Sequence, residues 1–547
     1  MLNVQIDGVW MQFPRGTRLI EACAQANKFV PRYCYHAKLS SPGNCRMCLI
    51  EMGMPKMGPD RNPVLGADGK PEIAWIPRPQ ISCAQDVAEG MAVRTDSPMV
   101  RDCRNGVMEF LLINHPLDCP ICDQAGECRL QEFSVDHGTG NSRFLEHKVK
   151  KPKNVEIGPR VTLDAERCIL CTRCIRFMQE VAHDDVLGIV DRGSHSTIAC
   201  HSDRKLDSNY SLNTVDICPV GALTSEDFRF KMRVWFLKET KSFCTSCATG
   251  CNTVIGSREN TIYRQTPREN NEVNSAWMCD YGRLNFHYLH SRDRLIEPVV
   301  AGVSDPGHRE VATWKSAIAR AAGALKKFRG DEIAIIASGR MTNEELWLTK
   351  KLAEALGTTL HDIVPHFAEG DDILLSSDRN PNTRGAQLLG ITGAIPGEHL
   401  GAIADGAHSG KIKALLVLGE DAVDAGIATD LLKIESLIAA NILPNATTKL
   451  ATVLLPGSGF AEKRGSMINA KGRLQRLNSS INPPGNARDD WEILRDLILA
   501  LNGNNGIYMI EDVFKQMAAS VPQLANLSLS KIGDLGVQLD LSTTSEK

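Results

Sequence analysis

This 547-residue chain has eighteen cysteines, but none of them lies among the 268 residues that follow Cys279. No apolar run approaches the ~18–20 residues that span a bilayer, and the first ten residues, MLNVQIDGVW, do not form a signal peptide. The net charge of −3 gives no indication of nucleic-acid binding or of a polybasic membrane anchor. We therefore expect a multidomain protein without its own membrane span, in a compartment where thiols stay reduced and hold metals.

The cysteines that are present fall into four sets, and one set includes a histidine. Iron–sulfur clusters need soft thiolate ligands, usually four per cluster. Close spacing such as C-x2-C lets one loop wrap a cluster, and a remote cysteine then closes it. The sets are Cys34, Cys45, Cys48 and Cys83; His115, Cys119, Cys122 and Cys128; Cys168, Cys171, Cys174 and Cys218; and Cys244, Cys247, Cys251 and Cys279.

The first set has the spacing C-x10-C-x2-C-x34-C. It resembles the plant-type [2Fe–2S] arrangement, in which C-x4-C-x2-C is closed by a distant cysteine, with a longer first gap. Gly43 and Gly53 are expected to relieve backbone crowding where N–H groups turn toward sulfide. This set predicts one [2Fe–2S] cluster.

The second set offers only three cysteines, which would leave one iron of a [4Fe–4S] cluster open. His115 is one helical turn from Cys119 in the sequence and can supply a neutral imidazole as the fourth ligand. Imidazole in place of a thiolate makes a cluster less negative and tends to raise its potential. The alternative is a capping or core histidine, which the missing ligand disfavours.

The third set ends in Cys218-Pro219 and is half of the bacterial ferredoxin pattern. We expect Cys218 to close the [4Fe–4S] cluster that Cys168 begins, and the fourth set, C-x2-C-x3-C-x27-C, to hold another. The alternative for every set is structural zinc, which four sets in series disfavour. Cys23 shares a helix face with Leu19 and is expected in a core, and Cys103 and Cys200 are left without a role.

The rest of the chain indicates an α+β multidomain protein. Asp7-Gly8 predicts a hairpin, and Thr17 is expected to cap the helix that follows it. After about residue 310, strands alternate with helices, which predicts an open α/β layer with a mostly parallel sheet; Thr342 and Glu345 form a capping box there. The predicted domains are 1–97, a [2Fe–2S] β-grasp domain; 98–157 and 158–236, two [4Fe–4S] domains; 237–296, a fourth cluster domain; and 297–547, an α/β domain.

Several strings of residues resemble one family, the large iron–sulfur subunit, or G subunit, of bacterial respiratory complex I. The fourth set and the part that follows it resemble molybdopterin oxidoreductases. The strings are Cys34-Tyr-His-Ala-Lys-Leu, Gly43-Asn-Cys45-Arg-Met-Cys48-Leu, His115 to Cys128 with Leu130-Gln131-Glu132, Cys168-Ile-Leu-Cys171-Thr-Arg-Cys174-Ile-Arg-Phe, Cys218-Pro-Val-Gly-Ala-Leu, and Phe460-Ala-Glu-Lys with Gly465, Asn469, Gly472-Arg473 and Gln475.

The resemblance implies an electron-relay subunit of NADH:quinone oxidoreductase, on the cytoplasmic side of the bacterial inner membrane. Its implied partners are a flavin-bearing, NADH-oxidising subunit, a small [2Fe–2S] subunit and quinone-module subunits, with no nucleic acid. We expect one [2Fe–2S] and three [4Fe–4S] clusters and no catalytic residue. Residues 297–547 are expected to be a truncated molybdopterin-type part without molybdenum. The alternative is a catalytic subunit of an NAD-linked formate dehydrogenase or hydrogenase, which the lack of cysteine after Cys279 disfavours.

Overall fold

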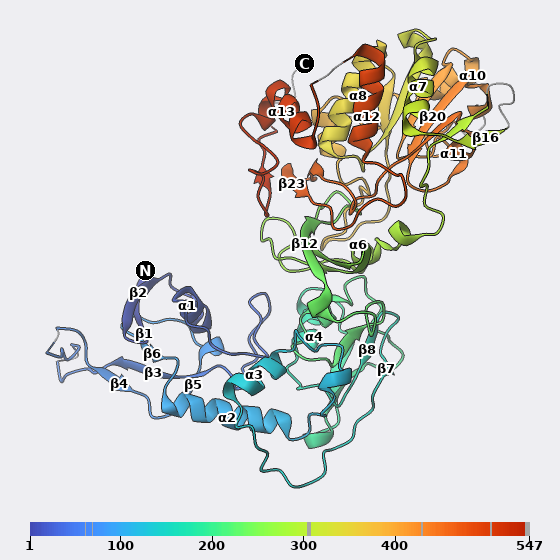
Figure 1. The fold of residues 1–547 in the computed structure, drawn as a ribbon. Coiled ribbons are helices and arrows are strands. Elements are labelled where there is room, and N and C mark those ends of the chain that lie inside the picture. The colour runs from blue at the N-terminus through green and yellow to red at the C-terminus, as the bar shows by residue number, and fades with distance from the viewer. Residues whose placement is uncertain (61, 68, 303–307, 428–429, 504–505, 542–547) are drawn as a thin grey trace. The chain divides into compact units, whose positions relative to one another are not determined.

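The computed structural model describes residues 1–60, 62–67, 69–302, 308–427, 430–503 and 506–541. They fold as two compact units, residues 1–236 and 237–547 (Figure 1). The cysteine sets are divided between the units, three in the first and one in the second. None of the helices in the described ranges is both long and apolar enough to cross a membrane.

The first unit begins with the hairpin that the sequence predicts. Asp7 and Gly8 both take positive φ, 48° and 86°, which gives a two-residue turn the twist of its flanking strands. The hairpin belongs to a sheet of order β2-β1-β6-β3-β4, in which β1 and β6 are parallel and β5 pairs with β3. These elements are β1 (Leu2–Ile6), β2 (Val9–Phe13), α1 (Leu19–Gln25), β3 (Leu49–Pro55), β4 (Ile73–Trp75), β5 (Gln80–Ile81) and β6 (Ala92–Arg94).

The prediction that Thr17 caps this first helix is wrong. Helix α1 begins at Leu19 after an Arg18 that makes no side-chain cap. The hydroxyl of Thr17 donates instead to the Pro14 carbonyl at 2.8 Å, a local bond that competes with capping. Cys23 is fully buried beneath the sheet, as predicted for a core residue.

The remainder of the first unit is short helices, small sheets and cysteine loops. Helix α2 begins at a Ser97 cap, whose hydroxyl accepts from the Val100 N–H at 3.3 Å. The elements are α2 (Pro98–Leu112), α3 (Arg129–His137), β7 (Val155–Glu156), β8 (Val161–Leu163), α4 (Arg173–Glu180), β9 (Leu187–Val190), β10 (Thr197–Cys200), α5 (Asn213–Asp216) and β11 (Leu223–Ser225).

The second unit starts with a three-stranded antiparallel sheet around the fourth cysteine set and continues into a larger α/β layer (Figure 1). The first elements are β12 (Lys238–Phe243), β13 (Asn252–Arg258), β14 (Thr261–Pro267) and α6 (Asp280–Leu284). The larger layer contains β15 (Val299–Ala301), β16 (Arg309–Val311), α7 (Trp314–Leu325), β17 (Ile333–Ser338), α8 (Asn343–Leu356), β18 (His361–Val364), α9 (Thr383–Leu388), α10 (Leu400–Ser409), β19 (Ala414–Leu418), β20 (Ser436–Asn441), α11 (Ala446–Leu450), β21 (Val453–Pro456), β22 (Gly465–Ile468), β23 (Arg473–Leu477), α12 (Asp490–Asn502), α13 (Ile510–Ser520) and β24 (Val537–Gln538).

The main sheet of this layer has the order β16-β15-β21-β20-β19-β17-β18, and the strands from β21 to β18 are parallel. Alternate residues of one strand enter two different cores: Ile333 and Ile335 pack with α8 and α12, whereas Ala334 and Ile336 pack with α10. Both faces of the sheet are therefore buried, as expected when crossover helices cover a parallel sheet. The mostly parallel layer predicted from the sequence is confirmed.

Candidate iron–sulfur sites

The structure brings the four cysteines of the first set together in the first unit. The Cys34 N–H points at the Cys45 sulfur at 3.5 Å, and the Cys83 thiol makes hydrogen bonds with both Cys34 and Cys48. The hydrogen bond with Cys34, and then burial, raise the pKa of Cys45. Four thiols gathered in a buried space with N–H groups aimed at sulfur fit the donor set of a cluster.

Only one of the two glycines expected near this set lies in its loop. Gly43 has a φ of +63°, which a residue with a side chain rarely adopts. Gly53 lies instead in β3, where a Cβ atom would meet an Ile73 side-chain carbon at 2.4 Å. Its role is close packing between strands, and the expectation that it relieves crowding at the cluster is wrong.

The three cysteines of the second set also lie together, since Cys119 and Cys122 both raise the pKa of Cys128 after burial does. Gly221, which follows Cys218 closely, faces this set: a Cβ atom there would stand 2.3 Å from the Cys122 sulfur. Arg233 holds the loop by donating to the carbonyls of Cys122 and Pro120 at 2.6 and 2.5 Å. At position 221, where the chain passes the Cys122 sulfur, only a residue without a Cβ atom fits.

His115 is not one helical turn from Cys119, because α2 ends at Leu112 and the segment up to Cys119 is irregular. Burial, and then the charges of Arg167 and Lys148, lower the pKa of His115 to about 4. The ring is therefore neutral near pH 7 and has a nitrogen lone pair to offer a metal. The charge of Arg167 also works to lower the pKa of Cys122, so His115 and Cys122 both lie near the Arg167 guanidinium.

The third set is deeply buried. Burial raises the pKa of Cys168 and Cys218 to about 11 and that of Cys171 to about 12. Burial, and then the charges of the other three cysteines of the set, raise the pKa of Cys174. Leu170 and Thr172 take positive φ, 52° and 61°, in the loop that wraps the set, and the Leu170 N–H points at the Cys168 sulfur at 3.4 Å.

Two arginines of α4 join the first and third sets, a role that the sequence analysis did not assign to either of them. Arg176 donates to the carbonyl of Cys34 at 2.6 Å, to that of Cys171 at 3.4 Å, and to Ser40. Arg173 donates to the carbonyls of Tyr35 at 2.5 Å and Ile217 at 3.2 Å. The loops of two cysteine sets are thus attached to one short helix.

The first set also adjoins the second. Tyr33 is fully buried, and both Cys45 and Cys128 act on its hydroxyl and raise its pKa after burial does. Its ring packs edge-on against Phe133 of α3, with 5.3 Å between the ring centroids, and its hydroxyl donates to the Met108 sulfur at 3.2 Å. All three sets of the first unit are therefore neighbours.

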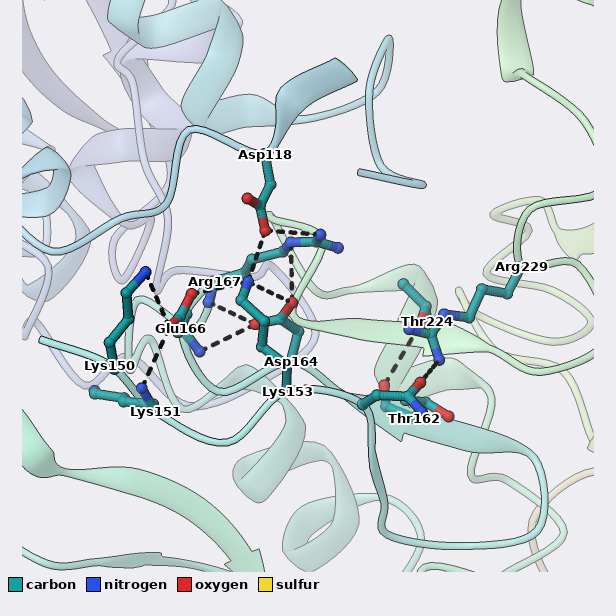
Figure 2. A network of polar contacts seen from close by, with 11 residues as sticks. Asp118, Lys150, Lys151, Lys153, Thr162, Asp164, Glu166, Arg167, Thr224 and Arg229 are labelled. Atoms are coloured by element: carbon teal, nitrogen blue, oxygen red, sulfur yellow. Dashed lines mark hydrogen bonds and ion pairs between the residues drawn. The ribbon is translucent and has the colours of Figure 1, made fainter. Parts of the chain in front are cut away.

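The basic segment 148–153, which its composition suggests is a linker, is fixed by ion pairs (Figure 2). Lys153 contacts Asp118, Asp164 and Glu166 at 2.6, 3.2 and 2.8 Å. Arg167 reaches Asp118 at 3.0 Å. Since Asp118 directly precedes Cys119, these contacts fasten the second cysteine loop to the segment that leads into the third.

The fourth set lies in the second unit. The Cys244 N–H donates to the Cys251 carbonyl at 2.7 Å, and Cys244, Cys247 and Cys279 all act on the thiol of Cys251. Cys279 caps α6 by accepting from the Gly282 N–H at 3.3 Å. A Cβ atom at Gly282 would stand 2.8 Å from the Cys244 sulfur, so this position also fits a close sulfur environment.

Residues far along the sequence hold the fourth loop. The Gln475 amide donates to the Gly250 carbonyl at 2.8 Å and to the Asn252 side chain at 3.0 Å. Asn469 donates to the Thr249 carbonyl at 3.0 Å. The polar residues of the molybdopterin-like string therefore support a cysteine loop, a role that no local pattern could indicate. The leftover Cys103 and Cys200 lie on α2 and β10, and Cys200 donates to the Ile157 carbonyl at 3.3 Å.

Five family models match the chain. Residues 1–98 match a 2Fe-2S iron-sulfur cluster binding domain, and residues 104–143 match the NADH-ubiquinone oxidoreductase-G iron-sulfur binding region. Residues 158–224 match the ferredoxin-like domain of NADH-quinone oxidoreductase subunit 3, residues 237–287 an NDSU1/NuoG-like 4Fe-4S domain, and residues 380–500 a molybdopterin oxidoreductase. The chain is an iron–sulfur protein with several cluster-binding domains and a molybdopterin-oxidoreductase-like region.

Curated relatives with names of their own are similar to a large part of the chain. The G subunit of NADH-quinone oxidoreductase from Rickettsia felis is 38% identical over 66% of this chain and 50% of its own. Subunit 3 from Thermus thermophilus is 39% identical over 65% of this chain and 47% of its own, and the mitochondrial iron-sulfur protein 1 of Solanum tuberosum is 38% identical over 65% and 45%. The chain is similar to NADH-quinone oxidoreductase G subunits, and it spans about half the length of these relatives.

Proposed function

We propose that this chain is an electron-relay subunit of the peripheral arm of an NADH:quinone oxidoreductase. The observation that carries the proposal is the adjacency of three cysteine sets within the first unit. Arg176 joins the first set to the third, Tyr33 lies near members of the first and second, and Gly221 joins the third to the second. Electron tunnelling falls steeply with distance, so a relay needs its centres side by side.

The proposed ligands are the sixteen residues of the four sets. One [2Fe–2S] cluster would be held by Cys34, Cys45, Cys48 and Cys83. Three [4Fe–4S] clusters would be held by His115, Cys119, Cys122 and Cys128; by Cys168, Cys171, Cys174 and Cys218; and by Cys244, Cys247, Cys251 and Cys279. The clusters, when bound, supply one-electron chemistry, while the chain holds the thiolates, directs N–H groups at sulfur and excludes water.

The proposed division of the chain follows the cysteine sets: domains 1–97, of β-grasp type, 98–157, 158–236, 237–296 and 297–547. The last part would be a truncated molybdopterin-type domain that carries no molybdenum. A separate molybdenum and tungsten analysis tests that point, and one mole of either metal per chain would favour the formate dehydrogenase alternative.

The proposed partners are an NADH-oxidising flavin subunit, a small [2Fe–2S] subunit and quinone-module subunits, on the cytoplasmic side of the inner membrane. The surface beside the second set supports a partner there. Leu117, Ile121 and Val135 are 87%, 65% and 82% exposed. They lie near a hollow of about 740 Å³ that Cys119, Cys128 and Trp235 help to line. Exposed apolar patches of this kind often mark protein contacts.

An anaerobic purification with metal analysis tests the proposal. We expect about fourteen irons per chain with equal acid-labile sulfide, the sum for one [2Fe–2S] and three [4Fe–4S] clusters. Reduction should then give four separate EPR signals. Stoichiometric zinc without labile sulfide would refute the relay and support a zinc scaffold.

A further inference from the structure

The main sheet of the second unit has a crevice at the point where its strand order reverses. Strand β17 is followed in sequence by β18 on one side of it and then by β19 on its other side. In open parallel sheets, ligands bind outside the carboxyl ends of the strands at such a point. A cavity of about 400 Å³ opens here, lined by the last residues of β17, β19 and β20, which are Ser338, Leu418 and Asn441.

Three potential metal ligands line this cavity. His366 comes two residues after β18, Glu420 two residues after β19, and Asp424 in the turn that follows. One ligand atom from each lies within 4.8 Å of the others. The His366 Nε2 and the Glu420 Oε2 are 2.8 Å apart. Imidazole and carboxylate donors from separate strand ends thus converge on one small space.

One oxygen of the buried Glu420 carboxylate, Oε1, has no hydrogen-bond partner among the described residues, while Oε2 contacts His366. The residue is only 5% exposed. Its position is fixed, because the side-chain amides of Asn441 and Asn445 donate to its backbone carbonyl at 3.0 and 3.1 Å. A buried carboxylate oxygen without a partner is costly, and a cation would remove that cost.

The neighbouring charges are arranged consistently with this idea. Asp421 does not compete for the space, because the Val423 and Ala446 N–H groups and the Thr447 hydroxyl occupy its carboxylate. Arg340 also lines the cavity and acts on His366, but its effect there is smaller than that of Glu420. Glu420 and Asp424 therefore place two carboxylates beside His366.

We propose that His366, Glu420 and Asp424 bind a divalent first-row metal ion, with Zn²⁺ as the best match. Zinc accepts one imidazole nitrogen and two carboxylate oxygens, and three protein ligands leave a fourth position open toward the cavity. Nothing in the proposed relay uses this site, so the two proposals stand or fall separately.

The test uses the full chain with its iron and labile sulfide already counted, treated with EDTA and dialysed against Zn²⁺. We expect one zinc per chain in the wild type and at least a tenfold weaker affinity in His366→Ala, Glu420→Gln and Asp424→Asn. Matched controls are His408→Ala and Asp405→Asn, on α10, which should keep the zinc. Asp424 is exposed, so its variant tests the site even if the buried variants misfold.

X-ray absorption at the zinc edge separates this site from zinc held by cysteine. Nitrogen and oxygen neighbours at about 2.0–2.2 Å, without sulfur at about 2.3 Å, are expected. A wild type that takes up no zinc, a sulfur shell, or equal binding by the variants and the wild type would overturn the proposal and leave His366 and Glu420 as an ion pair only.

Discussion

At the scale of single residues, Arg176 places one buried positive charge between two cysteine loops. A cation near a cluster favours the reduced, more negative state. We expect Arg176→Met to lower the midpoint potentials of the first and third clusters by some tens of millivolts, since a charge interaction on the order of 1 kcal/mol is involved. Redox titration by EPR checks this. Arg101→Met, on exposed α2 surface, should change neither potential, and unchanged potentials in both variants would leave Arg176 a packing role.

Substitution tests whether His115 is an iron ligand. As a neutral ligand it makes its cluster less negative, so His115→Cys should keep a cluster with a lower potential, and His115→Ala should lose or open that cluster. His137→Ala is the control, because His137 belongs to α3 and its ring lies tilted against that of Phe133, with a centroid distance of 6.0 Å. An unchanged EPR spectrum and unchanged potentials in His115→Ala would show a purely structural histidine.

Glu344 makes the second unit sensitive to pH. Burial raises its pKa to about 7, while the N–H and hydroxyl of Ser466 donate to it, both at 2.8 Å. The folded state therefore holds the proton more tightly than the unfolded state, and stability falls as pH rises from about 4.5 through 7. Between pH 6 and 8 the expected loss is about 1 kcal/mol. Calorimetry should show a smaller loss in Glu344→Gln than in the wild type or in Glu354→Gln, a change at an exposed site of the same helix. Equal losses in all three would contradict the assignment.

At the scale of elements, the sequence predicted those whose signals are local. Helix α8 begins with the Thr342–Glu345 capping box and ends at Gly357 with a φ of +68°, as its pattern indicates. Strands β18 and β20 give weaker sequence signals, because polar residues such as His361, Asp362 and Asn441 shorten their apolar runs. His366 and Glu420 follow different strands, and they come together in the crevice only because those strands lie in one sheet.

The attachment of the fourth loop is also a property of elements, since β23 supplies the Gln475 donor. Gln475→Ala removes two hydrogen bonds and leaves the Gly250 carbonyl without this donor, at a cost of about 1–3 kcal/mol. We expect reduced retention of the fourth cluster while the other three stay intact, measured as iron content and EPR signals. Gln387→Ala, which loses bonds to the carbonyls of Gly393 and Ala394, should retain all four clusters. Full iron content in Gln475→Ala would show that the loop holds without β23.

At the scale of the whole molecule, we expect the fourth cluster to support folding rather than electron flow. Metal binding contributes directly to folding where a small domain has little core of its own. Cys247→Ala should lower the assembly or thermal stability of the complex, whereas turnover per assembled complex, normalised to bound flavin, should stay near normal. A large fall in that ratio, with the other three clusters intact, would place this cluster on the main electron path.

The cysteine sets could be found in the sequence because each of them contains a C-x2-C pair with further ligand residues at recognisable spacings. What could not be found is how the sets meet. Arg173 and Arg176 look like the polar face of an amphipathic helix, and only the approach of residues 34–40 to α4 makes them contacts between sites. Gly221 likewise looks like an ordinary glycine after Cys-Pro until the Cys122 sulfur lies beside it.

The arginines of α4 also bear on how such proteins can be recombined. The loop around Cys34 depends on donors that lie about 140 positions further along the chain. Residues 1–98, which match a 2Fe-2S cluster binding domain, are therefore not self-sufficient: in another protein, without α4, the Cys34 and Tyr35 carbonyls would lack these donors. A natural or engineered fusion that contains this segment should also contain α4, or another surface whose arginines donate to these two carbonyls.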